Sequence, residues 1–158
     1  MDWKDLFLNF GGRISRKSWW IGFVLVQVVQ YGLNRLLPAV LGTNTDTMSP
    51  IIWQPIIVLA IIAYPLTALS SKRLNDRDRP SWLKWVFWSP NLLILPGMAL
   101  GVMFGPPRMI GTRLMPSLTP LGWASTVLAV IIGVGFIIEC GFLRGKSGPN
   151  RFGQDPLA

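Results

Sequence analysis

Four long apolar stretches occupy most of this 158-residue chain and constrain its fold more than any other feature. They lie at residues 19–37, 51–69, 82–104 and 121–143. A hydrocarbon core about 30 Å thick is crossed by roughly 20 residues of α-helix. Because backbone amides find no water inside lipid, such stretches favour helices over open strands. The sequence therefore predicts an all-α integral membrane protein with four transmembrane helices, in a single membrane domain over residues 1–158.

The distribution of Lys and Arg predicts the orientation of these helices. If each stretch crosses the membrane, nearly all basic residues fall in segments on one side. The other side keeps only Arg108 and Arg113, with Arg35 in the last turn of the first span. Short loops rich in Lys and Arg stay in the cytoplasm. We therefore expect both termini to be cytoplasmic.

The net charge of +8 has two interpretations. A basic surface is typical of proteins that bind nucleic-acid phosphates. Charge that sets membrane orientation explains the same excess, so we expect no nucleic-acid partner. Attraction to the bilayer and its anionic lipids, about 1 kcal/mol for each basic residue near the surface, is the milder consequence.

The residues before the first span carry a helical pattern of their own. Trp3, Leu6, Phe7 and Phe10 follow the spacing i, i+3, i+4 and i+7, with polar residues between them. This spacing gives a helix one apolar face. It predicts a short N-terminal amphipathic helix that lies in the membrane interface. The alternative is a frayed polar tail.

Three polar motifs fall at helix ends that the predicted topology brings to the cytoplasmic side. They are Gly12-Arg13-Ile14-Ser15-Arg16 with Trp19 and Trp20 after it, Lys72-Arg73-Leu74-Asn75-Asp76, and Asn150-Arg151-Phe152-Gly153-Gln154-Asp155-Pro156. In this order and spacing the chain resembles the bacterial family catalogued as domain of unknown function 805. That family pairs a GR-x-x-R segment and aromatics with a central RRLHD segment and a terminal NRFG-x-DP. The resemblance implies a small polytopic inner (plasma) membrane protein and no established reaction.

Two positions depart from the family pattern. Asn75 stands where the family usually has His, and Lys72 replaces the first Arg of the central segment. The chain has no histidine at all. A function of the family that required an imidazole would therefore be lost in this member.

The motif side chains have a physical interpretation of their own. Guanidinium groups bind carboxylates through two parallel hydrogen bonds, so Arg–Asp pairs between motifs would clamp the helix ends together. The four arginines outnumber the two aspartates, and the surplus could bind a lipid phosphate or a partner protein. The alternative is solvated charge that only sets orientation. The candidate residues for clamp or binding site are Arg13, Arg16, Arg73, Asp76, Arg151 and Asp155.

Glu139 is the one carboxylate inside the fourth apolar stretch. Ionisable residues within a span are costly and are functional candidates by default. This one lies about one turn from the predicted cytoplasmic end, so we expect a pair with Arg73 or Arg144, or contact with headgroups. A role in proton transfer is the alternative.

Enzymatic chemistry has little support in the sequence. The chain lacks histidine, has a single cysteine, Cys140, and has no glycine-rich phosphate loop. The usual nucleophile, base and metal constellations need those groups. We therefore expect no enzymatic activity, no cofactor and no metal site.

We expect a non-catalytic membrane module whose basic cytoplasmic face binds anionic lipid or docks a partner protein, which includes a second copy of the chain. The alternative is a small-solute or ion transporter or channel component that uses Glu139 and the polar residues Gln27, Gln30, Asn34 and Asn91. A polar stripe around one cavity would favour transport. Charge confined to the cytoplasmic rim would favour binding.

The orientation can be tested by labelling introduced cysteines. With Cys140 removed, a cysteine at position 45 should react in intact cells with a membrane-impermeant thiol reagent, because Thr45 falls in the predicted outer loop. A cysteine at position 147, in place of Ser147, should react only after the cells are opened. Labelling at position 147 but not at position 45 in intact cells would reverse the orientation.

Overall fold

The computed structural model describes residues 2–40, 49–110 and 113–157. Most of the predicted outer loop at 43–49, with Thr45, lies outside the described residues. The chain forms two compact units, one of Met1–Lys84 with Ile137–Ala158 and the other of Trp85–Phe136. Each unit is described by itself.

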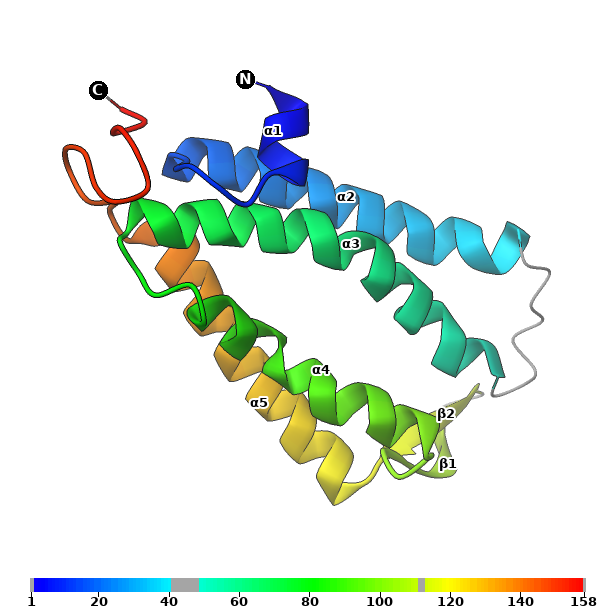
Figure 1. Cartoon of the computed structure of the whole chain (residues 1–158). Helices are drawn as coiled ribbons and strands as arrows, with labels where there is room; N and C mark the ends of the chain where they lie inside the picture. The colour runs from blue at the N-terminus through cyan, green and yellow to red at the C-terminus, as the bar shows by residue number, and fades with distance from the viewer. Residues whose placement is uncertain (1, 41–48, 111–112, 158) are drawn as a thin grey trace. The chain divides into compact units, whose positions relative to one another are not determined.

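The first unit contains a pair of long helices that pack against each other. Helix α2 spans Arg16–Val40 and helix α3 spans Ser49–Asp76. The short helix α1, Trp3–Leu8, contacts α3, and the π-helical turn η1, Ile138–Phe142, contacts both α2 and α3. In Figure 1 the N-terminus and the C-terminus both lie near the end of this unit where α2 begins and α3 ends.

The second unit consists of two helices and a β-hairpin. Helix α4 spans Leu83–Ala99, strands β1 and β2 span Phe104–Ile110 and Arg113–Leu118, and helix α5 spans Pro120–Ile137. The strands are antiparallel, with Phe104 opposite Leu118 and a shift of register between Gly105 and Arg108. The two prolines in that interval cannot donate ladder hydrogen bonds. Within this unit the rings of Phe87 and Phe136 meet at 4.3 Å between centroids.

The expectation of an entirely α-helical fold was wrong for the loop after the third apolar stretch. The predicted span 82–104 ends at Ala99, and the hairpin begins at Phe104. Gly101 has a φ of 71°, a left-handed conformation that commonly ends a helix and favours glycine. The shortened helix α4 has 17 residues, which is about 25 Å at 1.5 Å per residue.

The prediction of long apolar helices that could cross a membrane is confirmed. In the part of the chain that the structure describes, three helices are long and apolar enough to cross a bilayer by length and composition: Arg16–Val40, Gln54–Asp76 and Pro120–Phe142. The first of these helices contains the predicted span 19–37, and the other two cover most of the predicted spans 51–69 and 121–143. A fourth crossing by α4 stays a prediction.

Helix α3 continues well beyond the predicted end of its span at residue 69. Its last two turns contain the central motif, and all residues from Ala68 to Asp76 are buried. A polar segment that looked like a cytoplasmic loop is therefore helical and enclosed. The charged groups in it must find partners inside the protein, because burying an unpaired charge is very costly.

The predicted N-terminal helix is present as α1. Asp2 caps it by accepting from the backbone N–H of Lys4 and of Asp5, and Leu6 is its buried apolar residue. Lys72 of α3, only 1% exposed, donates to the Asp5 backbone carbonyl and to Asp5 Oδ2 at 2.8 Å. A buried lysine thus ties α1 to α3. The location of α1 in the membrane interface stays a prediction.

This tie should weaken in acid. The hydrogen bonds from Lys72 and then from Asn9 lower the pKa of the Asp5 carboxyl below its usual value. A lowered folded-state pKa means that the stabilisation is complete above the ordinary Asp pKa, about 3.9, and is lost as the pH falls through the folded-state pKa. Amide exchange in α1, corrected for intrinsic rates, should lose protection in that range.

The Asp5→Asn variant should have the low protection already at pH 7. Asp155→Asn, which changes a carboxylate in the C-terminal segment, serves as the control and should leave α1 protected at pH 7. Equal protection of α1 in Asp5→Asn and the unmodified protein would contradict the proposed tie.

Candidate functional site

Asp76, the last residue of α3, is the centre of an ion cluster at the end of the first unit. Its side chain is 4% exposed. Oδ1 accepts from Arg13 Nε at 3.0 Å, and Oδ2 accepts from Arg73 Nη1. Both arginine side chains are 1% exposed. The carboxylate therefore joins the N-terminal motif to the central motif inside the protein.

Arg13 extends this cluster to the C-terminal segment. Its Nη1 donates to the carbonyl oxygens of Gly148 at 2.7 Å and Gly153 at 3.2 Å, and its Nη2 donates to that of Lys146. The backbone N–H of Lys146 donates in turn to the Asp76 carbonyl oxygen at 2.9 Å. One guanidinium thus fixes the path of the chain after η1, because its donors point in several fixed directions.

The carbonyl oxygens at the end of the last helix are bound by side chains from the other helices. Helix ends leave their final carbonyls without partners and carry a partial negative charge. Here five successive carbonyl oxygens, from Glu139 to Leu143, accept from arginine or indole N–H groups. In order, the donors are Arg77 Nη1, Arg73 Nε, Trp20 Nε1, Arg16 Nη1 and Arg73 Nη2.

Two asparagines add neutral hydrogen bonds to the same junction. Asn75 Nδ2 donates to the carbonyl oxygens of Phe10 at 3.3 Å and Gly12 at 3.1 Å. Asn150 Nδ2 donates to the Asn75 carbonyl oxygen at 2.9 Å. Asn75 therefore acts as a donor to the backbone, a role that needs an N–H group but no titrating ring.

Glu139 forms ion pairs with two arginines that differ from the expected partners. Its Oε1 is 2.9 Å from Arg79 Nε and 3.3 Å from Arg77 Nε. The expected pair with Arg73 or Arg144 was wrong. Arg73 is committed to Asp76 and to the carbonyls of Cys140 and Leu143.

Arg151 and Asp155 of the terminal motif do not pair with the buried cluster. Arg151 Nε lies 3.0 Å from Asp78 Oδ1, so Arg151 takes no part in the clamp that was predicted between the motif arginines and Asp76 or Asp155. Asp155 accepts from the backbone N–H groups of Leu157 and Gly148, both at 3.0 Å. These bonds lower the pKa of the Asp155 carboxyl. Asp155 thus shapes the terminal turn.

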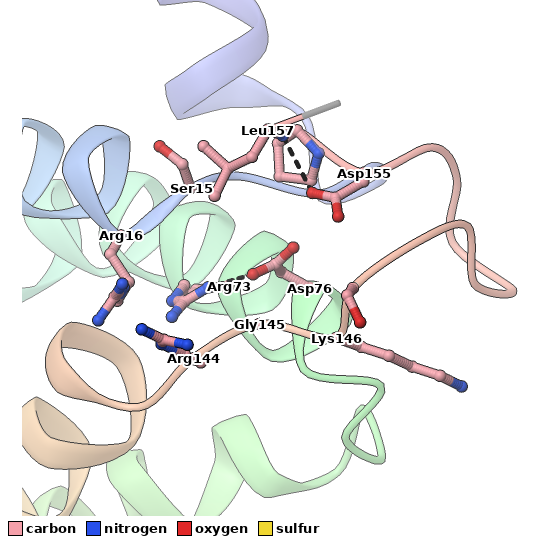
Figure 2. A pocket seen from close by; sticks show the side chains of 11 residues that line it. Ser15, Arg16, Arg73, Asp76, Arg144, Gly145, Lys146, Asp155 and Leu157 are labelled. Carbon is pink, nitrogen blue, oxygen red and sulfur yellow. Dashed lines mark hydrogen bonds and ion pairs between the residues drawn. The ribbon is translucent and has the colours of Figure 1, made fainter.

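A cavity of about 340 Å³ opens beside the cluster. Figure 2 shows the guanidinium groups of Arg16, Arg73 and Arg144 directed toward the same part of it, with Asp155 farther away. Arg16 and Arg144 are exposed. Within the part of the chain that the structure describes, Arg144 makes no hydrogen bond or ion pair, and Arg16 has only its bond to the Phe142 carbonyl at 3.2 Å.

Sequence reasoning missed two residues of this site. Arg144 had been considered only as a partner of Glu139. Gly145 was not singled out, yet a Cβ there would lie 1.9 Å from Asp76 Oδ2. Glycine is required because the backbone passes directly against the buried carboxylate. A glycine directly after the last apolar helix was the only signal in the sequence.

Residues of the three polar motifs meet at one end of the first unit, and the chain also has long apolar helices. These features define a polytopic helical membrane protein. The chain belongs to the family described as protein of unknown function (DUF805), whose model matches residues 7–154. The predicted family and the inner-membrane, multi-pass location are confirmed.

Two curated relatives from Escherichia coli strain K12 are similar over nearly their whole lengths. Inner membrane protein YhaH is 27% identical over 160 residues, which cover 99% of this chain and 97% of the relative. Inner membrane protein YhaI is 23% identical over 150 residues, which cover 95% and 87%. No solved structure matches the chain.

Removal of the central carboxylate should destabilise the protein strongly. Asp76→Asn leaves Arg13 and Arg73 buried without their counter-charge, and breaking a buried ion pair from one side costs about 3–5 kcal/mol. We expect a large fall in the melting temperature in mild detergent. Asp78→Asn is the matched control, two residues away with a side chain that is 30% exposed, and should cause a much smaller fall.

A double-mutant cycle identifies the pair itself. Arg13→Gln with Asp76→Asn should destabilise by less than the sum of the two single changes, because each single change leaves the other charge unmatched. Strictly additive losses would show that Arg13 and Asp76 do not stabilise the protein through each other.

Proposed function

We propose that this protein is a non-catalytic module of the inner membrane whose basic end binds anionic phospholipid. In this proposal α4 supplies a fourth crossing, and both termini lie in the cytoplasm. The positive-inside rule supports that orientation. Anionic lipid headgroups carry the charge that such a surface attracts.

The observation that carries the proposal is a surplus of exposed cations at one end of the first unit. Arg13 and Arg73 are enclosed by Asp76 and by backbone carbonyls, so they add little to the surface. Among the described residues of this unit, five cations are exposed and have no ion pair. Arg35 lies toward the far end of α2, and the other four belong to the charged end: Lys4, Arg16, Lys17 and Arg144.

The apolar surface next to these cations fits a lipid better than a fully hydrated partner. Phe142 is 63% exposed, and Leu143 is 40% exposed. Both lie within two residues of Arg144, and Phe142 also packs edge-on against Trp20 at 5.8 Å between ring centroids. Aromatic residues beside basic residues are typical of the membrane–water interface.

The transport alternative has weaker support. Glu139, the carboxylate on which that alternative depends, forms ion pairs within the protein with Arg77 and Arg79. The polar residues Gln27 and Asn34 of α2 are both exposed in the first unit.

Competition between brominated lipids tests the proposal, because bromine atoms quench tryptophan fluorescence on contact. In proteoliposomes of the full chain, brominated phosphatidylglycerol should quench more strongly than brominated phosphatidylcholine at equal mole fraction. The preference should shrink between 0.1 M and 1 M salt, since the screening length falls from about 10 Å to about 3 Å.

Glu139→Gln is the control, because transport through that carboxylate would require its charge whereas lipid preference would not. The variant should keep the preference for phosphatidylglycerol. Equal quenching by the two lipids at both salt concentrations would contradict the proposed function.

A further inference from the structure

We propose that the cavity between Arg16 and Arg144 is a binding site for the phosphate of an anionic phospholipid. This inference rests on the proposed function and gives it a location. Arg16 begins α2, Arg144 follows η1, and Arg73 also lines the cavity.

The first argument is the charge that remains after the internal pairs are formed. Four basic side chains and two carboxylates line the cavity. Asp76 is bound by Arg13 and Arg73, and Asp155 is bound by two backbone N–H groups. Lys146 reaches out to Asp78 at 3.0 Å. Arg16 and Arg144 are therefore left facing the cavity without a carboxylate partner.

The second argument is the chemistry of the groups that remain. Guanidinium groups present planar forks of N–H donors that match phosphate oxygens in pairs. The hydroxyl-bearing residues Ser15 and Ser147 also line the cavity. Its volume of about 340 Å³ is within the range of small-ligand pockets, about 300–1,000 Å³.

The third argument concerns the source of the phosphate. Pro156 and Leu157 line the cavity, and Leu157 is 78% exposed. Phe142 and Leu143, next to Arg144, add exposed apolar surface beyond it. A free phosphate would use only the arginines, whereas a phospholipid would place its phosphate on them and its glycerol and acyl carbons against these side chains.

Three soluble probes separate the parts of the ligand. Dioctanoyl phosphatidylglycerol carries phosphate and chains, inorganic phosphate carries only the anion, and dioctanoylglycerol carries only the chains. Each is titrated into the purified full chain in a nonionic detergent at 0.1 M salt, and binding is measured by the rise in melting temperature. We expect the tightest binding for dioctanoyl phosphatidylglycerol.

The arginines are tested by substitution. Arg144→Gln should weaken binding of dioctanoyl phosphatidylglycerol about 10-fold, because a hydrogen bond to a charged group contributes on the order of one power of ten or more in affinity. This variant removes no side-chain hydrogen bond or ion pair among the described residues, so it should fold normally. The double variant Arg16→Gln, Arg144→Gln should bind still more weakly, and Arg16→Lys should keep part of the affinity.

The matched control removes the same amount of charge outside the cavity. Lys4→Gln with Lys17→Gln neutralises two exposed cations that do not line it, one of them adjacent to Arg16. This control should reduce affinity less than 2-fold.

Several outcomes would overturn the inference. If the double arginine variant bound dioctanoyl phosphatidylglycerol with unchanged affinity, the cavity would be excluded as the binding site. A preference for brominated phosphatidylglycerol would then still support lipid binding by the basic surface as a whole. Equal affinity for inorganic phosphate would replace the lipid with a free anion. If dioctanoylglycerol bound as tightly as dioctanoyl phosphatidylglycerol, the phosphate would not be what the site recognises. If the unmodified protein showed no preference for brominated phosphatidylglycerol over brominated phosphatidylcholine, the proposed function itself would be contradicted.

Discussion

The buried carboxylate of Asp76 is the interaction on which the organisation of this protein's charged end depends. Two arginines that are 1% exposed approach it from different parts of the chain. One carboxylate cannot balance two guanidinium groups, so the remaining charge must be stabilised by dipoles. The carbonyl oxygens around Arg13 and Arg73 supply them. The C-terminal segment is thus held in place because its backbone completes the solvation of buried cations.

The same requirement explains why a π-helical turn is stable where the last helix ends. A helix that ends among cations gains from the partial negative charge of its final carbonyls. The five carbonyls from Glu139 to Leu143 accept from donors on α2, on α3 and on Arg77 directly after α3. Arginine suits this role better than lysine, because one guanidinium reaches two carbonyls and a carboxylate at once. Arg73 makes all three of these contacts.

The sequence predicted the long helices because hydrophobic length is a local property of the chain, and it predicted the family because the motifs are contiguous. It failed where the outcome depends on distant segments. Residues 72–76 carry loop-like polarity, yet α3 continues through them because Asp5, Arg13 and the carbonyls of η1 supply their partners. The end of α4 was missed although its signal, Gly101, was local, because a glycine inside an apolar run is common in membrane helices.

The most consequential distinction was the one between arginines of a single motif. Arg13 and Arg16 are three residues apart and have the same side chain, so charge and spacing could not tell which of them is buried and which is exposed. The fold separates them, because Arg13 precedes α2 and turns inward to Asp76, whereas Arg16 begins the helix and stays exposed. Arg144, outside every motif, faces the same cavity as Arg16. One motif thus holds a buried residue that fixes the fold and, three residues later, an exposed residue that faces a cavity. In the proposal made above, the second of these residues binds the lipid phosphate, so a motif that looks uniform in sequence would serve architecture at one position and ligand binding at another.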